Sequence, residues 1–148
     1  MDHENYMRRA LSLAEDCIEY GDVPVGCVVV GPDGRVIGEG RNAREEDGMA
    51  TAHAEIEAIN MACRTLGSWR LTGCTLYVTL EPCPMCAGAI INSRIAEVRY
   101  GAREEKSGCC GSVLNLFEER FNHKPRIYGG LLAEESRALL DRFFRSLR

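Results

Sequence analysis

The residue types best suited to chemistry form two short clusters, His53 with Glu55 and Cys83 with Cys86. Cys83 and Cys86 are three positions apart, so on a helix their thiols share one face of the first turn. The partial positive charge at a helix N-terminus favours the thiolate, which is the form of cysteine that binds metal. Two sulfurs and one imidazole suit zinc, and three protein ligands leave a fourth position for water, as in catalytic zinc sites.

Glu55 stands two residues after His53, a separation that on a helix points the two side chains in nearly opposite directions. They converge only near a helix end. That geometry suits a carboxylate that faces metal-bound water without ligating the metal, which is the position of a general acid and base. The two clusters therefore predict a zinc site on His53, Cys83 and Cys86, with Glu55 as the proton shuttle.

Each cluster taken alone has another interpretation. A His-x-Glu triplet often arises by chance. A Cys-x-x-Cys pair that follows a strand and opens a helix is also typical of a thioredoxin-like redox pair, or of half a structural zinc site that Cys109, Cys110 or His123 would complete. Together, His-Ala-Glu and Pro-Cys-Pro-Met-Cys match the H-x-E and P-C-x-x-C signature of zinc deaminases, which favours the catalytic interpretation.

Hydrophobic periodicity predicts the elements that position these clusters. Helices are expected at residues 7–18, 52–63 and 84–91, followed by a closing helix marked by Leu140, Phe143, Phe144 and Leu147. Strands are expected at residues 25–30, 35–39, 75–80, 95–100 and 126–128, and residues 41–49 are expected to be an irregular loop. Strands that alternate with helices predict an α/β fold, a three-layer α/β/α sandwich around a mixed five-stranded sheet.

The 148 residues are expected to form a single domain, because 45% hydrophobic and 27% charged residues are ordinary for a globular chain. The longest nearly apolar run, residues 23–30, is far shorter than the roughly 20 residues of a membrane-spanning helix. The first residues lack an export signal, so we expect a cytoplasmic protein without a membrane partner. The cysteines are then reduced thiols, and four of them lie within apolar patterns and are expected in the core: Cys17, Cys27, Cys63 and Cys74.

Charge is distributed unevenly along the chain, whose net charge is -4. Residues 1–93 hold 7 Lys and Arg against 14 Asp and Glu, whereas residues 94–148 hold 11 against 8. A basic C-terminal part permits a polyanionic partner, because binding depends on the local field rather than on the total charge. Arg142, Arg145 and Arg148 recur at a spacing of three, and we expect them to contact phosphates.

Several sequence blocks extend beyond the two clusters. They are V-P-V-G-C-V at 23–28, G-R-N at 40–42, T-A-H-A-E-I at 51–56, T-L-Y-V-T-L-E-P-C-P-M-C-A-G-A-I at 75–90, S-R-I at 93–95, G-A-R-E-E-K-S-G at 101–108 and F-N-H at 121–123. In these blocks, and over nearly its whole length, the chain resembles the bacterial tRNA-specific adenosine deaminases. The resemblance implies a cytidine deaminase-like fold and a homodimer with one Zn2+ per subunit.

The resemblance also implies a reaction, the hydrolysis of adenosine to inosine at the wobble position of an arginine tRNA with an ACG anticodon. The anticodon base would be splayed into the pocket, as RNA readers usually require. Zinc-bound hydroxide would attack C6 of adenine, while Glu55 would protonate N1 and then the departing amine. Two other functions stay open: a deaminase of free nucleosides or nucleobases, and a non-catalytic zinc-stabilised RNA-binding subunit, against which Glu55 argues.

The resemblance assigns the walls of the base pocket. Asn42 would hold the purine edge, since an amide both donates and accepts, although a loop-capping asparagine is the alternative interpretation. Val25 and the backbone N–H of Ala54 match positions that line the base pocket.

Further positions match the tRNA-facing surface of the family. Lys106 and Asn122 match positions near the flanking nucleotides, although a solvated surface charge is the alternative interpretation of Lys106. His123 belongs to the same tRNA-facing segment or is a structural residue. Glu104 lies beside the sugar where the family usually has Asp, which puts fine discrimination of neighbouring nucleotides in doubt. Arg41 replaces a common aromatic residue, and Cys109-Cys110 replaces small ones.

Overall fold

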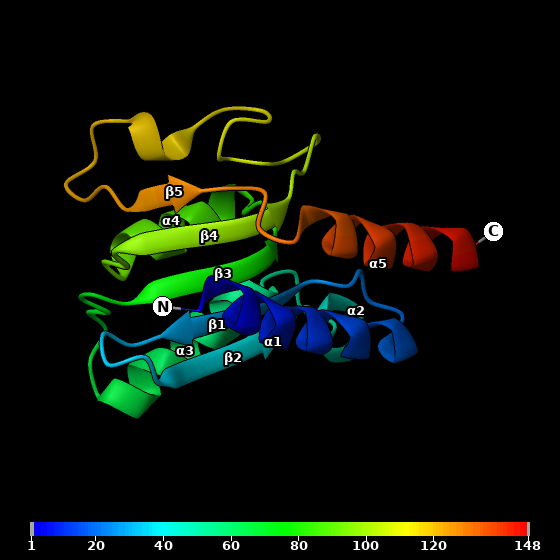
Figure 1. Cartoon of the computed structure of the whole chain (residues 1–148), viewed down its shortest axis with the longest axis horizontal. Coiled ribbons are helices and arrows are strands. Elements are labelled where there is room, and N and C mark those ends of the chain that lie inside the picture. Colours follow the sequence, from blue (N-terminus) through cyan, green and yellow to red (C-terminus); the bar gives the residue numbers. More distant parts are fainter. Residues whose placement is uncertain (1, 148) are drawn as a thin grey trace.

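The protein is built around a mixed five-stranded sheet, seen in a computed structural model that describes residues 2–147 (Figure 1). The strands are β1 (Gly26–Val30), β2 (Val36–Arg41), β3 (Thr75–Leu80), β4 (Glu97–Ala102) and β5 (Arg126–Tyr128), in the order β2-β1-β3-β4-β5. β1 runs antiparallel to β2 and β3, whereas β3, β4 and β5 are parallel. The parallel strands therefore end at one edge of the sheet, at the right of Figure 1.

Helices cover both faces of the sheet. α1 (His3–Asp16) and α5 (Ala133–Ser146) lie on one face, and α3 (Ala54–Leu66) and α4 (Pro84–Asn92) lie on the other (Figure 1). Short elements complete the chain: η1 (Ile18–Tyr20), α2 (Arg44–Asp47) and η2 (Leu116–Glu118). The predicted α/β/α sandwich with a mixed five-stranded sheet is confirmed. Within residues 2–147, no helix combines the length and apolar character that crossing a bilayer would take.

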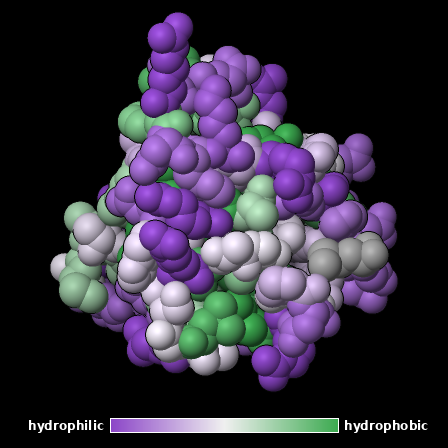
Figure 2. Space-filling view, turned by 90° about the vertical axis from the view of Figure 1, so that its left-hand side faces the viewer, coloured by the Kyte–Doolittle hydropathy of each residue, from purple (hydrophilic) through white to green (hydrophobic). Residues whose placement is uncertain are grey.

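Alternation along the central strands supplies both layers of the core. In β1, Cys27 and Val29 face α3, whereas Val28 and Val30 face α1. Because both faces are covered, the strand is a continuous apolar run rather than an alternating one. The surface at the left-hand end of the sheet in Figure 1 is mainly polar. Hydrophilic side chains predominate there, and apolar ones form small separate areas (Figure 2).

The structure differs from the expected elements mainly where long-range contacts decide. α1 ends at Asp16 and the chain continues as the 3-10 turn η1, closed by Gly21 at a φ of 75°. The loop expected at 41–49 contains α2, because the carboxylate of Asp22 accepts hydrogen bonds from the N–H groups of Glu45 (2.7 Å) and Glu46 (3.2 Å). Because Asp22 lies 23 residues before Glu45, this cap leaves no local signal in the sequence around α2.

Burial of the cysteines follows the expectation with one exception. Cys17, Cys27 and Cys74 are buried, whereas Cys63 is only half-buried near the end of α3. The expected closing helix is present as α5, and only some of its apolar side chains are buried. Its Leu140 and Phe143 are buried, whereas Phe144 is 47% exposed and Leu147, which caps the end of α5, is 67% exposed.

Glycines bring two helices directly onto the sheet. A Cβ at Gly26 would lie 1.9 Å from the carbonyl oxygen of Ala10 in α1. On the other face, a Cβ at Gly38 would lie 2.2 Å from the oxygen of Ala58, and one at Gly40 would lie 2.3 Å from that of Ala54, both in α3. Any side chain at these positions would push the helix off the strand, so the absence of a Cβ sets how close α3 lies to β2.

We therefore expect Gly38→Ala to lower the free energy of unfolding by about 1–3 kcal/mol or more, because the added methyl group overlaps the α3 backbone. Urea denaturation measures the change. Gly88→Ala is the matched control: Gly88 lies within α4 with open space around it, so alanine there should leave stability unchanged or raise it by up to about 1 kcal/mol. Equal stability of the Gly38 variant and the parent protein would contradict the close packing of α3 on β2.

Candidate active site

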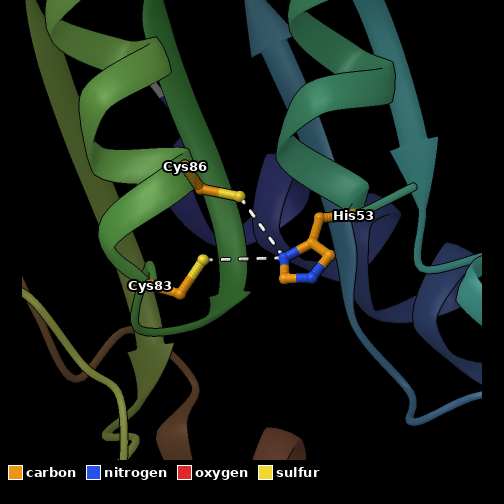
Figure 3. A group of neighbouring side chains, drawn as sticks. All are labelled: His53, Cys83 and Cys86. Atoms are coloured by element: carbon orange, nitrogen blue, oxygen red, sulfur yellow. Dashed lines mark hydrogen bonds between the residues drawn. The ribbon is translucent and has the colours of Figure 1, made fainter. Parts of the chain in front are cut away.

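The two chemical clusters lie at the starts of two neighbouring helices. His53 is the extended N-cap residue of α3, and Cys83 is the extended N-cap residue of α4, which has Pro84 in its first turn. Pro84 suits that place, because its missing N–H would have no partner there and its ring presets a helical φ. Cys86 follows one turn into α4. Both helices begin at the edge of the sheet where β3 ends, so the three side chains point toward one another (Figure 3).

The ligand atoms are close enough to hold one metal ion. The Nδ1 of His53 lies 3.6 Å from the sulfur of Cys83 and 3.5 Å from that of Cys86 (Figure 3). All three atoms lie within 4.8 Å of one another, and no other such group of His, Cys, Asp or Glu occurs in the described part of the chain. Two sulfurs and one nitrogen fit zinc, with the fourth position open.

The alternative of a structural zinc site lacks a fourth protein ligand. Cys109 and Cys110 are not part of the group of ligand atoms. The Nε2 of His123 lies 2.6 Å from the carbonyl oxygen of Ile95, at the start of the segment leading into β4. His123 thus joins the loop before β5 to the sheet, which is the structural role that the sequence left open for it.

The electrostatics of the cluster favour a thiolate. Hydrogen bonding to Cys86 and to His53 lowers the pKa of the Cys83 thiol to about 4, against the opposing effect of burial. The same bond to Cys83, together with burial, raises the pKa of Cys86, and hydrogen bonding to Cys83 raises the pKa of His53. Cys83 is therefore the group most ready to bind a cation.

Glu55 lies in the first turn of α3 and is only 4% exposed. Burial raises the pKa of its carboxyl to about 7. A group with a pKa near neutrality both accepts and returns a proton readily, which is the requirement for a general acid and base. Glu55 has this property without belonging to the group of metal-ligating atoms.

A pocket borders this cluster, because His53 and Cys83 are among its lining residues. It is lined by Val23, Val25, Asn42, Arg44, His53, Ala54, Glu55, Leu80, Glu81, Cys83, Glu104, Ser107 and Phe144. Four predicted substrate contacts, Val25, Asn42, Ala54 and Glu104, thus line one pocket together with the predicted ligands His53 and Cys83. The other two do not line it: Lys106 is exposed beside Ser107, and Asn122 is exposed in the segment before β5.

Asn42 performs the loop-capping role that was its alternative interpretation. Its Nδ2 donates to the carbonyl oxygen of Val23 (3.1 Å), and its Oδ1 accepts from the N–H of Arg44 (3.3 Å). An amide has a second N–H and a second lone pair. Asn42 therefore has its orientation fixed by the protein and keeps one donor and one acceptor for a molecule in the pocket.

The comparisons with known proteins agree with this geometry. A family described as MafB19-like deaminase matches residues 1–148. The chain belongs to this family. A relative named tRNA-specific adenosine deaminase, from Bacillus subtilis (strain 168), is 49% identical over 146 residues, 98% of this chain and 90% of its own. The resemblance seen in the sequence blocks is thus confirmed.

Solved structures of similar proteins show the same fold. One, from biochemical and structural studies of A-to-I editing by tRNA:A34 deaminases, has a TM-score of 0.88 and 45% identity, and the match covers 92% of this chain and 99% of that one. A guanine deaminase from Bacillus subtilis has a TM-score of 0.67 and 34% identity, with 99% of this chain and 95% of that one covered. The architecture of this deaminase therefore also occurs in a protein named for a free base.

Six residues that line the pocket were not predicted from the sequence: Val23, Arg44, Leu80, Glu81, Ser107 and Phe144. Phe144 and Glu81 were missed for different reasons. Phe144 has helical spacing with Leu140 and was expected only to mark the closing helix, but it lines the pocket. Glu81 follows a buried strand and precedes Cys83, and a charge in that place is the signal that could have been used. Burial alone would raise the pKa of Glu81, but hydrogen bonds from Ser112 and from backbone N–H groups hold it below the usual value.

Arg142 and Arg145, two of the three arginines of the expected stripe, lie on a different side of α5 from Phe144. Arg142 and Arg145 line a groove between α1 and α5, and Arg142 donates to the carboxylate of Glu15 (3.3 Å). Arg148 lies outside the described residues. Since Phe144 lines the active-site pocket, the helix directs its aromatic residue to the pocket and Arg142 and Arg145 to the groove.

We expect the purified protein to carry zinc and Cys86→Ser to remove most of it, because the substitution takes away one of the three predicted ligands. Metal content per chain, measured by atomic emission after dialysis, tests this. Cys109→Ser is the matched control, since Cys109 is equally buried but outside the ligand group, and it should retain zinc. Full zinc in the Cys86 variant would rule out the proposed ligand set.

Proposed function

We propose that this deaminase hydrolyses adenosine to inosine at the wobble position of a tRNA, with an arginine tRNA bearing an ACG anticodon as its substrate. One observation carries the chemistry: buried Glu55, with a pKa of about 7, lies in the same pocket as His53 and Cys83. Similarity over 98% of the chain to a protein named tRNA-specific adenosine deaminase supports an adenosine in tRNA as the substrate. The wobble position, the arginine tRNA and its ACG anticodon are what the resemblance of the sequence blocks implies.

His53, Cys83 and Cys86 would hold one zinc ion, which when bound supplies a Lewis acid that lowers the pKa of water to ~7. Glu55 takes a proton from the attacking water and delivers one to N1 of adenine. A second proton passes through Glu55 to the amine at C6, so that adenosine and water become inosine and ammonia. The burial of Glu55 suits this work, because its carboxyl gains and loses protons near neutral pH.

The other pocket residues would bind and orient the base. Val25 and Leu80 line the pocket with apolar surface. Ala54 is the first residue of α3, so its N–H has no partner within the helix and can donate to the substrate. The amide of Asn42, whose orientation is fixed by Val23 and Arg44, keeps a donor and an acceptor for the purine edge.

A polynucleotide substrate would extend beyond the pocket. Glu104 on its rim would lie near the sugar, and exposed Lys106 and Asn122 would lie near the flanking nucleotides. The half-exposed ring of Phe144 offers a stacking surface at the mouth. A free base would fill the pocket but contact little of its rim. The rim residues therefore favour a substrate whose base is part of a larger molecule.

We also infer a single domain over residues 1–148 that works as a cytoplasmic homodimer with one zinc ion per subunit. The homodimer follows from the resemblance of the sequence blocks to the tRNA-specific adenosine deaminases. Sedimentation of the zinc-loaded protein measures the oligomeric state directly.

Deamination of a free base is the second candidate, because the guanine deaminase from Bacillus subtilis shares the fold. The half-exposed Phe144 at the pocket mouth and the basic C-terminal part favour tRNA instead. Inosine formation in the arginine tRNA, measured beside turnover of free adenosine, cytidine and guanine, decides between the two. Turnover of a free base alone would keep the zinc chemistry and overturn the tRNA substrate.

Glu55→Ala should keep zinc yet lose on the order of 10²- to 10⁴-fold in rate or more, because the proton shuttle is gone while all three ligands remain. Inosine in the arginine tRNA is counted by sequencing or digestion, and zinc is measured in parallel. Glu57→Gln is the matched control, since Glu57 lies on the same helix and outside the pocket. Retained activity of the Glu55 variant with full zinc would remove its assigned role.

Alanine at Arg142, Arg145 and Arg148 together should weaken tRNA binding and reduce the slope of log affinity against log salt by about 1 for every phosphate that these side chains neutralise. Binding titrations at several salt concentrations measure both quantities. Arg35→Ala is the control, because Arg35 is exposed beside Asp33 in the turn before β2. If the triple variant keeps the affinity and salt slope of the parent, these arginines do not contact tRNA.

A further inference from the structure

The carboxylate of Glu81 is buried without a cationic partner. Glu81 follows β3 directly, is only 3% exposed, and forms no ion pair with any described residue. A buried carboxylate is costly unless several donors satisfy it. The hydrogen-bond donors that surround the Glu81 carboxylate therefore indicate its structural role.

Those partners all belong to one loop, the segment 103–112 that follows β4. The Oε1 of Glu81 accepts from the N–H of Glu104 (3.0 Å) and from the hydroxyl of Ser112. Its Oε2 accepts from the N–H of Cys110 (2.8 Å) and from that of Ser112 (3.1 Å). Hydrogen bonds to a charged acceptor are stronger than neutral ones. One side chain thus joins the beginning of the loop to its end.

The loop is shaped to receive this side chain. A Cβ at Gly108 would lie 2.3 Å from the carboxyl carbon of Glu81 and 2.5 Å from the carbonyl oxygen of Glu104. Only glycine therefore leaves space for the carboxylate inside the loop. A neighbouring backbone bond, from the N–H of Cys109 to the oxygen of Pro82 (2.8 Å), joins the same two segments.

The loop held in this way is one wall of the active-site pocket. Glu104 and Ser107 line the pocket, and Lys106, whose N–H donates to the Oε1 of Glu104 (3.0 Å), stands between them in sequence. The proton shuttle Glu55 and the ligand His53 come from α3 instead. Displacing the loop would therefore change the contacts around the target base while leaving Glu55 on its helix.

We propose that Glu81 is a positioning residue that holds loop 103–112 in its substrate-binding conformation and thereby sets the affinity for the nucleotides beside the target base. The assignment of those nucleotides rests on the proposed tRNA function. The hydrogen bonding of the loop to Glu81 does not depend on that function. The anchoring of the loop and its effect on substrate binding are therefore tested separately.

The first arm of the test is hydrogen exchange of the zinc-loaded protein. Glu81→Gln replaces one acceptor oxygen by an NH2 group facing backbone N–H donors. We expect faster exchange of the amides of Glu104, Cys110 and Ser112, with zinc content unchanged. Unchanged exchange at these amides would overturn the proposal, whatever the substrate is.

The second arm is steady-state kinetics with the arginine tRNA. Glu81→Gln should lower kcat/KM by about 10- to 100-fold, mainly through KM, because substrate binding is weakened while the chemistry is kept. A loss confined to kcat, at unchanged KM, would overturn the positioning role. No turnover of tRNA by the parent protein would refute the proposed function and leave the exchange result standing.

Two further variants separate positioning from general destabilisation. Gly108→Ala crowds the carboxylate from the opposite side and should reproduce both the faster exchange and the higher KM. Glu97→Gln removes another largely buried carboxylate, one that accepts from Arg99 and Arg126 away from the pocket, and should change neither. If Glu97→Gln raised KM as much as Glu81→Gln, the effect would be loss of stability and the proposal would be wrong.

Discussion

The distance between the two helices of the active site depends on direct contact of backbone with backbone. At Gly38 and Gly40 no side chain separates β2 from α3, so the axis of the helix lies as near to the sheet as its own main chain allows. His53 stands at the start of that helix, and Cys83 stands at the start of α4. Since a metal site tolerates little error in ligand position, the packing of α3 on β2 determines whether the three ligands meet.

Three buried carboxyl groups near the pocket have different environments and correspondingly different tasks. Glu55 is buried with few donors, and its pKa rises to about 7. Glu81 is also buried, yet its donors hold the pKa below the usual value. Asp22 accepts two N–H groups of α2. The pKa values of Glu55 and Glu81, which line the same pocket, are thus shifted in opposite directions, and this separates proton transfer from structural support.

The sequence was most informative where the relevant geometry is local. The spacing of Cys83 and Cys86, with Pro84 between them, predicted a helix start that carries both thiols, and a helix start is set by a few neighbouring residues. The order of strands and helices likewise predicted the three layers. Local patterns suffice for these features because period and capping are properties of short segments.

What the sequence did not predict depends on contacts between distant segments. α2 is stabilised by Asp22, which accepts hydrogen bonds from its first turn. No residue near 44–47 indicates that this distant cap is present. Phe144 follows the helical spacing of a core residue but faces the pocket, since α5 extends past the edge of the sheet (Figure 1). The dual position of Asn42, bonded to Val23 and Arg44 while facing the pocket, is visible only when the loops are assembled.

The anchoring of the pocket walls has a consequence for how this enzyme can change over evolutionary time. Asp22 and Glu81 bind their loops mainly through main-chain N–H groups, which every residue type except proline possesses. Side chains at 104–107 can therefore be exchanged without removing those anchoring bonds, provided that proline stays away from 104. New preferences for the surroundings of the target base can arise by drift in these side chains while the framework that holds them persists.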